Sequence, residues 1–274
     1  MGATCLMCIC SRRMSLAVSW KDIMKSLRRR SDEIKELFPV FEEVRSKRLV
    51  DNARSSAIIG CGYGESELAF LKHCIPSLEV LSALEPDTDS VVELTANIAR
   101  QLSNVHVRTA VYQDVAESWA ADTDQVFDVV IMFHCVNEFP EPTRRLLFSR
   151  LFESVIKPNG LLIITTRTGL LDGTRTMENR IMEALNRRPC LDHKWYEEAR
   201  QQLESVGFVV CYERRYAIDV NLENLDEGYF GLHARLSDQP TSLETAERVT
   251  RSVVGDAKKS RREFIFGVFR KPLS

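Results

Sequence analysis

The stretch AIIGCGYGES, residues 57–66, places three glycines at alternate positions directly after a short apolar run. An apolar run that breaks into such glycines is typical of a buried strand whose end turns into a tight loop. Glycine lets the backbone of the loop approach a ligand closely, and the helix that follows offers free amide groups. We therefore expect a strand, a ligand-binding loop and a helix of an α/β fold here.

The bulk composition limits the kind of protein. The chain has 274 residues, of which 44% are hydrophobic, and a formal net charge of −2. No apolar run is long enough to span a bilayer, and a dedicated nucleic-acid binder would usually be basic. Cysteines at 61, 74, 135 and 211 lie in apolar surroundings without metal-ligand spacing, as expected of reduced thiols in the cytosol. We expect a cytoplasmic monomer without nucleic-acid partner, stable membrane insertion or bound metal.

The first residues differ from the rest. Cys5, Cys8 and Cys10 are candidates for metal ligation or acylation, but no fourth ligand lies nearby. Leu6 stands where a myristoylation signal needs Ser or Thr. We predict a disordered tail over residues 1–19.

The remaining chain, residues 20–274, reads as one domain. Residues 20–50 favour helix, with Pro39 as the expected break. Beyond them, apolar runs alternate with helical patterns at the spacing of βα units. Strands are predicted over 55–62, 78–86, 105–114, 126–136, 157–167, 208–219 and 262–272. Helices are predicted over 65–75, 87–103, 142–156 and 192–208.

This order predicts a doubly wound, mostly parallel sheet with helices on both faces. The last strand has no helix directly before it, so we expect it to run antiparallel at the edge of the sheet. Residues 216–262 are far too many for a hairpin loop and are predicted to form an inserted helical cap. The charge run from Lys258 to Arg262 is expected in a solvated loop.

The residues around the glycine loop discriminate between two nucleotide-type ligands. A dinucleotide loop has the pattern G-x-G-x-x-G, in which the third glycine opens the helix next to the pyrophosphate. Counted from Gly60 and Gly62, that third position is Glu65, and a carboxylate there would repel two phosphates. The loop favours an adenosyl ligand whose methionine part faces Gly60 and Gly62.

Three polar residues extend this hypothesis. Glu85 ends the second strand, where a carboxylate can accept both ribose hydroxyls, although dinucleotide enzymes share this feature. Gln113 and Asp114 follow the third strand and could accept the adenine amino group. Each residue also has a structural alternative, since Glu85 suits a solvated turn and Asp114 a helix cap.

As a set, these motifs resemble the class I S-adenosylmethionine-dependent methyltransferases from about residue 55 to the C-terminus. The matching pieces are AIIGCGYGE, ALEPD, FDVVIMFHCVNEF, KPNGLLIITT and SVGF. The resemblance implies a Rossmann-like methyltransferase fold with seven strands, the last antiparallel, and S-adenosylmethionine as cofactor. The helices at 20–50, ALEPD and the long insertion also make the chain similar to histamine N-methyltransferase.

The acceptor of such a reaction should lie beyond the fourth strand. His134 is either a core histidine or a hydrogen-bonding wall and proton acceptor for the substrate. Asn137 and Glu138 could cap the next helix or serve the same site, and Phe133 could be core or pack on the adenine.

The narrower resemblance implies further substrate contacts. Histamine N-methyltransferase carries an acidic residue on its N-terminal helix, which corresponds here to Asp32 or Glu33. Its glutamine after the fourth strand corresponds here to His134. Its asparagine near the last strand falls at Arg262 and Glu263, so the substrate should be a related small amine or imidazole compound rather than histamine itself.

An aromatic pair and three rival functions remain open. Trp195 and Tyr196 either pack a helix face or form part of a substrate wall. An NAD-dependent oxidoreductase is disfavoured by Glu65, and a nucleic-acid methyltransferase by the sequence HCVNEF after the fourth strand. A non-catalytic binding module on the same scaffold is the third alternative.

Overall fold

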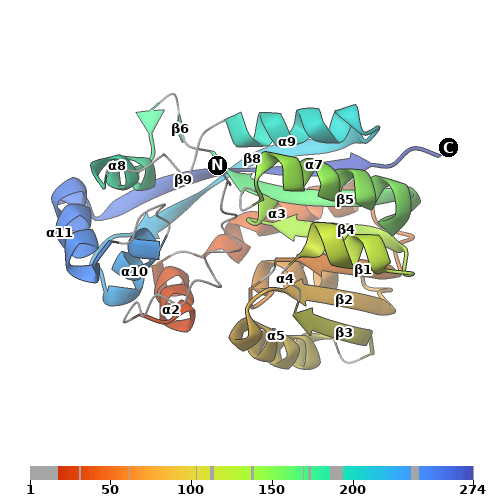
Figure 1. Cartoon of the computed structure of the whole chain (residues 1–274), viewed down its shortest axis with the longest axis horizontal. Coiled ribbons are helices and arrows are strands. Elements are labelled where there is room, and N and C mark those ends of the chain that lie inside the picture. Colours follow the sequence, from red (N-terminus) through yellow and green to blue (C-terminus); the bar gives the residue numbers. More distant parts are fainter. Residues whose placement is uncertain are drawn as a thin grey trace.

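The computed structural model describes residues 18–30, 32–60, 62–102, 104–111, 114–136, 139–168, 170–171, 174–185, 194–235 and 241–273. Figure 1 shows a central sheet with helices on both faces and a group of helices at one end. The strands of the central sheet are β1 (Ser55–Ile59), β2 (Val80–Glu85), β3 (His106–Val111), β4 (Phe127–Phe133), β5 (Ile156–Arg167), β8 (Val209–Asn221) and β9 (Lys259–Arg270). β6 (Leu170–Leu171) and β7 (Thr174–Arg175) form a separate small hairpin.

The helices follow the alternation that the sequence predicts. The α-helices are α2 (Trp20–Arg30), α3 (Glu33–Ser46), α4 (Glu65–Cys74), α5 (Thr88–Gln101), α6 (Ala120–Asp122), α7 (Glu141–Arg150), α8 (Met177–Ala184), α9 (Lys194–Ser205), α10 (Glu227–Arg235) and α11 (Leu243–Val254). Two wider, π-helical turns are η1 (Val115–Trp119) and η3 (Leu151–Val155).

The sheet has the order β3-β2-β1-β4-β5-β9-β8. β9 runs antiparallel to both β5 and β8, and the other pairs are parallel. The predicted seven-stranded α/β sheet with an antiparallel last strand is confirmed, but its place at the edge is wrong. β9 is almost continuously buried from Phe264 onward, whereas β8 alternates between buried and exposed residues. A strand covered on both faces suits the interior of a sheet, and an alternating strand suits its edge.

The buried residues of the strands divide between two layers. In β4, Val129, Ile131 and Phe133 face the layer built by α3, α4 and α5. Val130 and Met132 face the layer of η1, α7 and α9. Successive side chains of a strand point to opposite faces, so one apolar strand supplies both cores.

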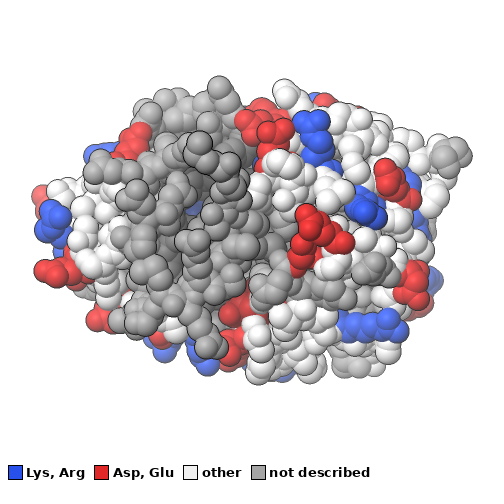
Figure 2. All heavy atoms as spheres, in the orientation of Figure 1, with Lys and Arg blue, Asp and Glu red and all other residues white. Residues whose placement is uncertain are grey.

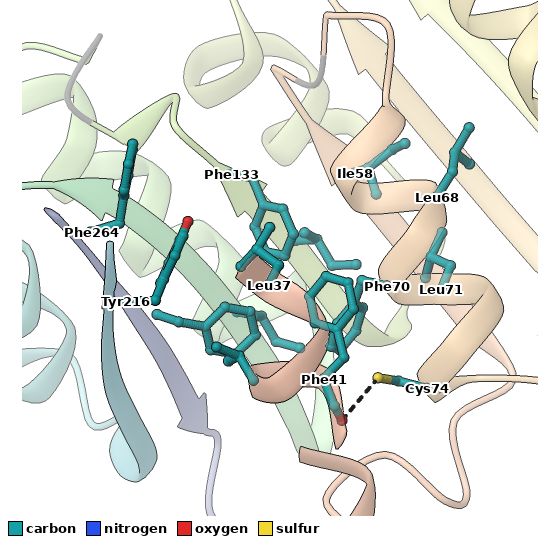
Figure 3. Close-up of a cluster of buried hydrophobic side chains, with 14 of the residues drawn as sticks. Leu37, Phe41, Ile58, Leu68, Phe70, Leu71, Cys74, Phe133, Tyr216 and Phe264 are labelled. Atoms are coloured by element: carbon teal, nitrogen blue, oxygen red, sulfur yellow. Dashed lines mark hydrogen bonds between the residues drawn. The ribbon is translucent and has the colours of Figure 1, made fainter. Parts of the chain in front are cut away.

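Figure 3 shows the first of these cores. Phe41 from α3, Phe70 from α4 and Phe133 from β4 lie close together, and Phe70 and Phe133 have ring centroids 6.2 Å apart. The Cys74 thiol lies 3.6 Å from the Phe41 carbonyl oxygen. Burial raises the pKa of this thiol to about 12, so it is a core thiol rather than a reactive one.

Helix α3 contradicts the predicted break at Pro39, because it continues through that residue. The helix boundary lies earlier, between Arg30 and Glu33, where Asp32 caps α3 by accepting a hydrogen bond from the Lys35 amide at 3.2 Å. A proline inside a helix costs about 3 kcal/mol. The burial of apolar residues on both sides of it, Leu37 and Phe41 among them, outweighs that cost.

A helical cap lies at the end of the sheet where the parallel strands finish (Figure 1). It consists of α2, α8, α10 and α11, which contact one another in the order α2-α10-α11-α8. α10 and α2 approach closely, because a Cβ at Gly228 would come within 2.5 Å of the Asp22 carbonyl oxygen. Val18, assigned to the tail by the sequence, is buried in this cap, whereas residues 1–17 lie outside the described part.

Charges of both signs are interspersed on the face shown in Figure 2, as expected from a formal net charge of −2. Within the described ranges, no helix combines the length and the apolar character that crossing a membrane requires.

Candidate functional site

The glycine loop joins β1 to α4 at the carboxyl end of the sheet. Gly60 has φ +63° and Gly62 has φ +52°, a backbone region that side chains disfavour. A Cβ at Gly60 would lie 2.7 Å from the Cys135 Cβ, whereas a Cβ at Gly62 would meet no atom within 4 Å. Gly60 is therefore required by packing, and Gly62 leaves the edge of the loop open for a ligand.

Glu85, at the end of β2, reaches into this loop. Its Oε2 accepts a hydrogen bond from the Gly62 amide at 2.8 Å, and its Oε1 accepts one from the Asp87 amide at 3.3 Å. Burial raises the pKa of Glu85 to about 7, although the two amides counteract that rise. A buried carboxylate with free lone pairs can accept further hydrogen bonds, such as those of a vicinal diol.

Asp114 takes the structural role that the sequence left as an alternative. Its Oδ1 accepts a hydrogen bond from the Glu117 amide at 2.9 Å and caps η1. It still follows β3, at the same end of the sheet as the carboxyl ends of β1 and β2. Gln113, the other predicted adenine contact, lies outside the described residues.

A second polar cluster forms beyond β4. Nε2 of His134 lies 2.6 Å from Oε1 of Glu33, and the Tyr216 hydroxyl donates to the same oxygen at 3.0 Å. His134 directly follows β4, Glu33 lies on α3 and Tyr216 on β8, and these residues are up to 183 positions apart in the chain. Of the two acidic candidates, Glu33 enters this cluster and Asp32 caps α3.

The backbone of His134 is itself unusual. Its φ of +58° lies in the left-handed region, which costs a residue with a side chain about 1–2 kcal/mol. The His134 amide donates to the Thr165 carbonyl oxygen at 3.0 Å, which holds this conformation at the end of β4. Such strained residues often occur at functional sites.

Aromatic rings enclose the cluster on one side. The Phe264 ring meets the His134 imidazole edge to face at 5.1 Å between centroids, and it stacks on Tyr216 with an interplanar angle of 15°. The Arg167 guanidinium lies 5.8 Å from the centre of the same ring. Burial works to raise the pKa of Glu33, but the neighbouring His134 and Tyr216, together with Arg167, hold it below its ordinary value.

The charges of both clusters act on the carboxyl of Glu67. It lies in the first turn of α4 and is buried. Burial is the main reason that its pKa rises to about 8, and the negative charges of Glu33, Glu85 and Glu65 contribute to the rise. The candidate cofactor contact Glu85 and the candidate acceptor contact Glu33 therefore lie around one common region.

Two predicted contacts prove to be core residues. Phe133 packs between Phe70 and Phe266, with centroid distances of 6.2 and 5.7 Å, and only 2% of the residue is exposed. Tyr196 is buried in the opposite layer, where its hydroxyl donates to Glu213 at 2.9 Å. It therefore packs α9 on the sheet and does not form part of a wall beside His134.

The expectation of a solvated charge run is wrong for Arg262. Its side chain alternates inward along β9, like that of Phe264, and its Nε donates to Glu178 Oε1 at 2.5 Å. Only about one twentieth of either side chain is exposed, at 5% and 4%.

Asn137, Glu138 and the side chain of Trp195 lie outside the described part of the chain.

Several residues of the site carry no sequence signal of their own. Thr165 and Phe264 read as ordinary strand residues, and Glu67 as the exposed start of a helix. These residues come together at one end of the sheet only through the register of β5, β8 and β9. That register aligns Thr165 with Phe266 and Tyr216 with Phe264.

Comparisons with known proteins address this arrangement at the level of the fold. No family model matches the sequence, and no curated protein matches it either. Among solved structures, the candidate methyltransferase BH2331 from Bacillus halodurans C-125 covers 82% of this chain and 98% of its own, with a TM-score of 0.54 and 17% identity. The chain has the fold of the class I methyltransferases.

Two further structures show how widely that fold is used. A candidate sarcosine dimethylglycine methyltransferase from Galdieria sulphuraria covers 85% of this chain and 86% of its own, with a TM-score of 0.51 and 18% identity. The [4+2]-cyclase SpnF covers 86% and 82%, with a TM-score of 0.52 and 16% identity. Because a cyclase shares the class I methyltransferase fold, the reaction has to be argued from the site.

Proposed function

We propose that this protein is an S-adenosylmethionine-dependent methyltransferase that acts on the amine or imidazole nitrogen of a small molecule. The observation that carries the proposal is that the charges of two clusters, Glu85 with the glycine loop and Glu33 with His134, both act on the buried carboxyl of Glu67. The glycine loop and Glu85 would hold the cofactor, and the cluster of Glu33 and His134 would hold the methyl acceptor.

The residues of the loop fit the cofactor. Glu85 is buried and offers carboxylate lone pairs for the two ribose hydroxyls. Gly62 leaves open space beside the loop backbone, and α4 begins after Gly64 without a side-chain cap, so its first amides can take the methionine carboxylate. When bound, the cofactor supplies a methyl group on a positively charged sulfur, which leaves as a neutral thioether.

The contribution of the protein to such a reaction is alignment. Glu33, His134 and Phe264 come from three elements and form a wall at the strand ends, where the acceptor can be oriented. Holding two reactants at near-attack distance accounts for much of the rate enhancement of bimolecular transfers. His134, whose side chain is 26% exposed, can also accept a proton from the acceptor.

The first experiment tests the cofactor. Calorimetry and thermal shift are measured with S-adenosylmethionine, S-adenosylhomocysteine and NAD in parallel. We expect binding of the two adenosyl ligands and none of NAD, and a response to NAD alone would overturn the proposal in favour of an oxidoreductase. In the same assays Glu85→Ala should bind the adenosyl ligands more weakly than the control variant Glu79→Ala, because Glu79 is exposed and pairs with Arg54 just before β2.

The second experiment tests the reaction. Purified protein is incubated with methyl-labelled cofactor and a panel of amines, imidazoles, phenols, thiols and carboxylates. Label in amines or imidazoles alone supports the proposed acceptor class. Transfer only to the other classes contradicts it, and cofactor binding without transfer to any class favours the non-catalytic binding module.

A further inference from the structure

The hydrogen bond between Glu33 and His134 has a defined direction. The pKa of Glu33 is held below its ordinary value against the effect of burial, so the carboxyl is ionised at neutral pH. An ionised carboxylate only accepts hydrogen bonds, and therefore Nε2 of His134 carries the proton in the 2.6 Å contact. In the neutral imidazole the other nitrogen, Nδ1, then has a free lone pair.

The surroundings keep the imidazole in this state. Tyr216 donates to the same Glu33 oxygen and fixes the carboxylate, and Phe264 lies edge to face with the ring. Thr165 Oγ1 lies 3.4 Å from each ring nitrogen, so its hydroxyl is a long and weak partner of Nδ1 that a substrate ammonium would have to displace. The backbone of His134 is held at φ +58° to place the ring there.

We infer that Nδ1 of His134 is the general base that removes a proton from the acceptor, with Glu33 and Tyr216 as positioning residues. The inference rests on the proposed function and narrows its substrate class. A base of this kind is needed when the nucleophilic nitrogen is protonated at neutral pH. The acceptor is therefore a primary or secondary alkylammonium rather than an aromatic amine.

The step balances in protons and electrons. Nδ1 takes one proton from the ammonium, which leaves a neutral amine and an imidazolium paired with the Glu33 carboxylate. The amine lone pair then forms the new N–C bond while the C–S bond breaks and its electron pair stays on sulfur. The imidazolium returns its proton to solvent through its exposed edge, since 26% of the side chain is accessible.

Four of the elements around this base contribute a charged or titratable group, whereas β9 contributes the Phe264 ring. Glu33 lies on α3, Tyr216 on β8, Arg167 on β5 and Glu67 on α4. Burial and the Glu33 charge raise the pKa of Tyr216 well above its ordinary value, so this hydroxyl stays protonated.

The test compares two acceptors in the wild type and in His134→Gln. Benzylamine is protonated at pH 7, whereas aniline is not. We expect an acid limb in the pH profile of kcat/KM for benzylamine, which the variant loses together with about 100-fold or more of the rate. Aniline methylation should change by less than about threefold. Equal losses for both acceptors, or an unchanged rate with benzylamine, would overturn the inference.

The positioning role has its own control. In Glu33→Gln the pH profile of kcat/KM for benzylamine should change, because Nε2 of His134 loses the carboxylate that orients the ring. Glu42→Gln, on the same helix, breaks a similar carboxylate–imidazole pair with His73 at 2.7 Å and should leave the profile unchanged. A shift of equal size in both variants contradicts the assignment.

The tautomer can be measured without any acceptor. Nitrogen-15 NMR of the histidine-labelled full chain, assigned by comparison with His134→Gln, should show the proton of neutral His134 on Nε2. A proton on Nδ1 refutes the base even if methyl transfer occurs. Failure to bind the cofactor refutes the proposed function instead, so the two failures are distinguishable.

Discussion

The buried ion pair between Glu178 and Arg262 gives a sharp test of the structure. It joins α8 of the helical cap to β9, with Nε and Oε1 2.5 Å apart. Burial opposes the ionisation of Glu178, but the Arg262 guanidinium, helped by Arg167, holds its pKa below the ordinary value. Replacing Arg262 by Met keeps an unbranched side chain and removes the charge.

The expected cost follows from the exposure of the two side chains, 5% for Arg262 and 4% for Glu178. Removal of one partner leaves a carboxylate buried without compensation, which costs about 3–5 kcal/mol of unfolding free energy. In a domain of about this size each kcal/mol lowers Tm by about 2–4 °C. The Tm of Arg262→Met should therefore fall by about 10 °C.

The unfolding free energy of Arg262→Met should depend on pH with the opposite sign to that of the wild type. In the wild type Glu178 has a lowered pKa, so its stabilising contribution is present above the unfolded pKa of about 4.3 and is lost as pH falls through the folded value. In Arg262→Met the pKa of the unpaired Glu178 carboxyl should lie above its ordinary value. The deficit relative to wild type should therefore shrink as pH falls from 7 to 5.

Urea unfolding at pH 7 and pH 5 measures both effects. Arg145→Met is the control, because Arg145 forms an exposed ion pair with Glu141 at 3.1 Å and should lose less than about 0.5 kcal/mol. The double variant Glu178→Leu with Arg262→Met should recover most of the loss. A deficit no larger than that of the control, or one that does not change with pH, would refute this account of the pair.

Two further predictions concern the loop. Glu85→Ala should weaken S-adenosylmethionine binding by about 1–3 kcal/mol in calorimetry. The pKa of Glu85 is raised to about 7, so the affinity of the wild type for S-adenosylmethionine should increase between pH 6 and 8 as the carboxylate forms. An unchanged affinity would mean that the ribose is held elsewhere. Gly62→Ala should cost only the left-handed backbone, about 1–2 kcal/mol, whereas Gly60→Ala should cost more because its Cβ would meet Cys135 at 2.7 Å. Equal thermal stability of the two variants would contradict this.

The sequence predicts the cofactor side of the fold well because that side is built from local units. β1, the glycine loop, α4 and β2 with Glu85 follow one another within about thirty residues of the chain. Apolar runs, glycines and caps mark each unit, and βα connections leave few alternatives for their arrangement. The Asp87 cap of α5, which accepts from the Ser90 amide at 2.8 Å, is readable in the same way.

The acceptor side depends on contacts that local patterns do not encode. Glu33 and His134 are 101 positions apart, and Glu33 and Tyr216 are 183 apart. The helical cap combines segments before β1, between β5 and α9, and between β8 and β9. The insertion of β9 between β5 and β8 turns Arg262 inward, and tertiary packing carries α3 through Pro39. These outcomes depend on strand register and burial rather than on propensity.

The carboxylates also bear on the choice of ligand, beyond the argument from Glu65 in the sequence. Burial, with neighbouring carboxylates, raises the pKa of Glu67 to about 8 and that of Glu85 to about 7. Raised values at these two carboxyls mean that ionising them in this site has a free-energy cost and that both are partly protonated at neutral pH. A pyrophosphate would add two more negative charges and increase that cost, whereas a sulfonium with its ammonium group would reduce it. The raised pKa values of Glu67 and Glu85 therefore support the proposed cationic adenosyl cofactor over a dinucleotide.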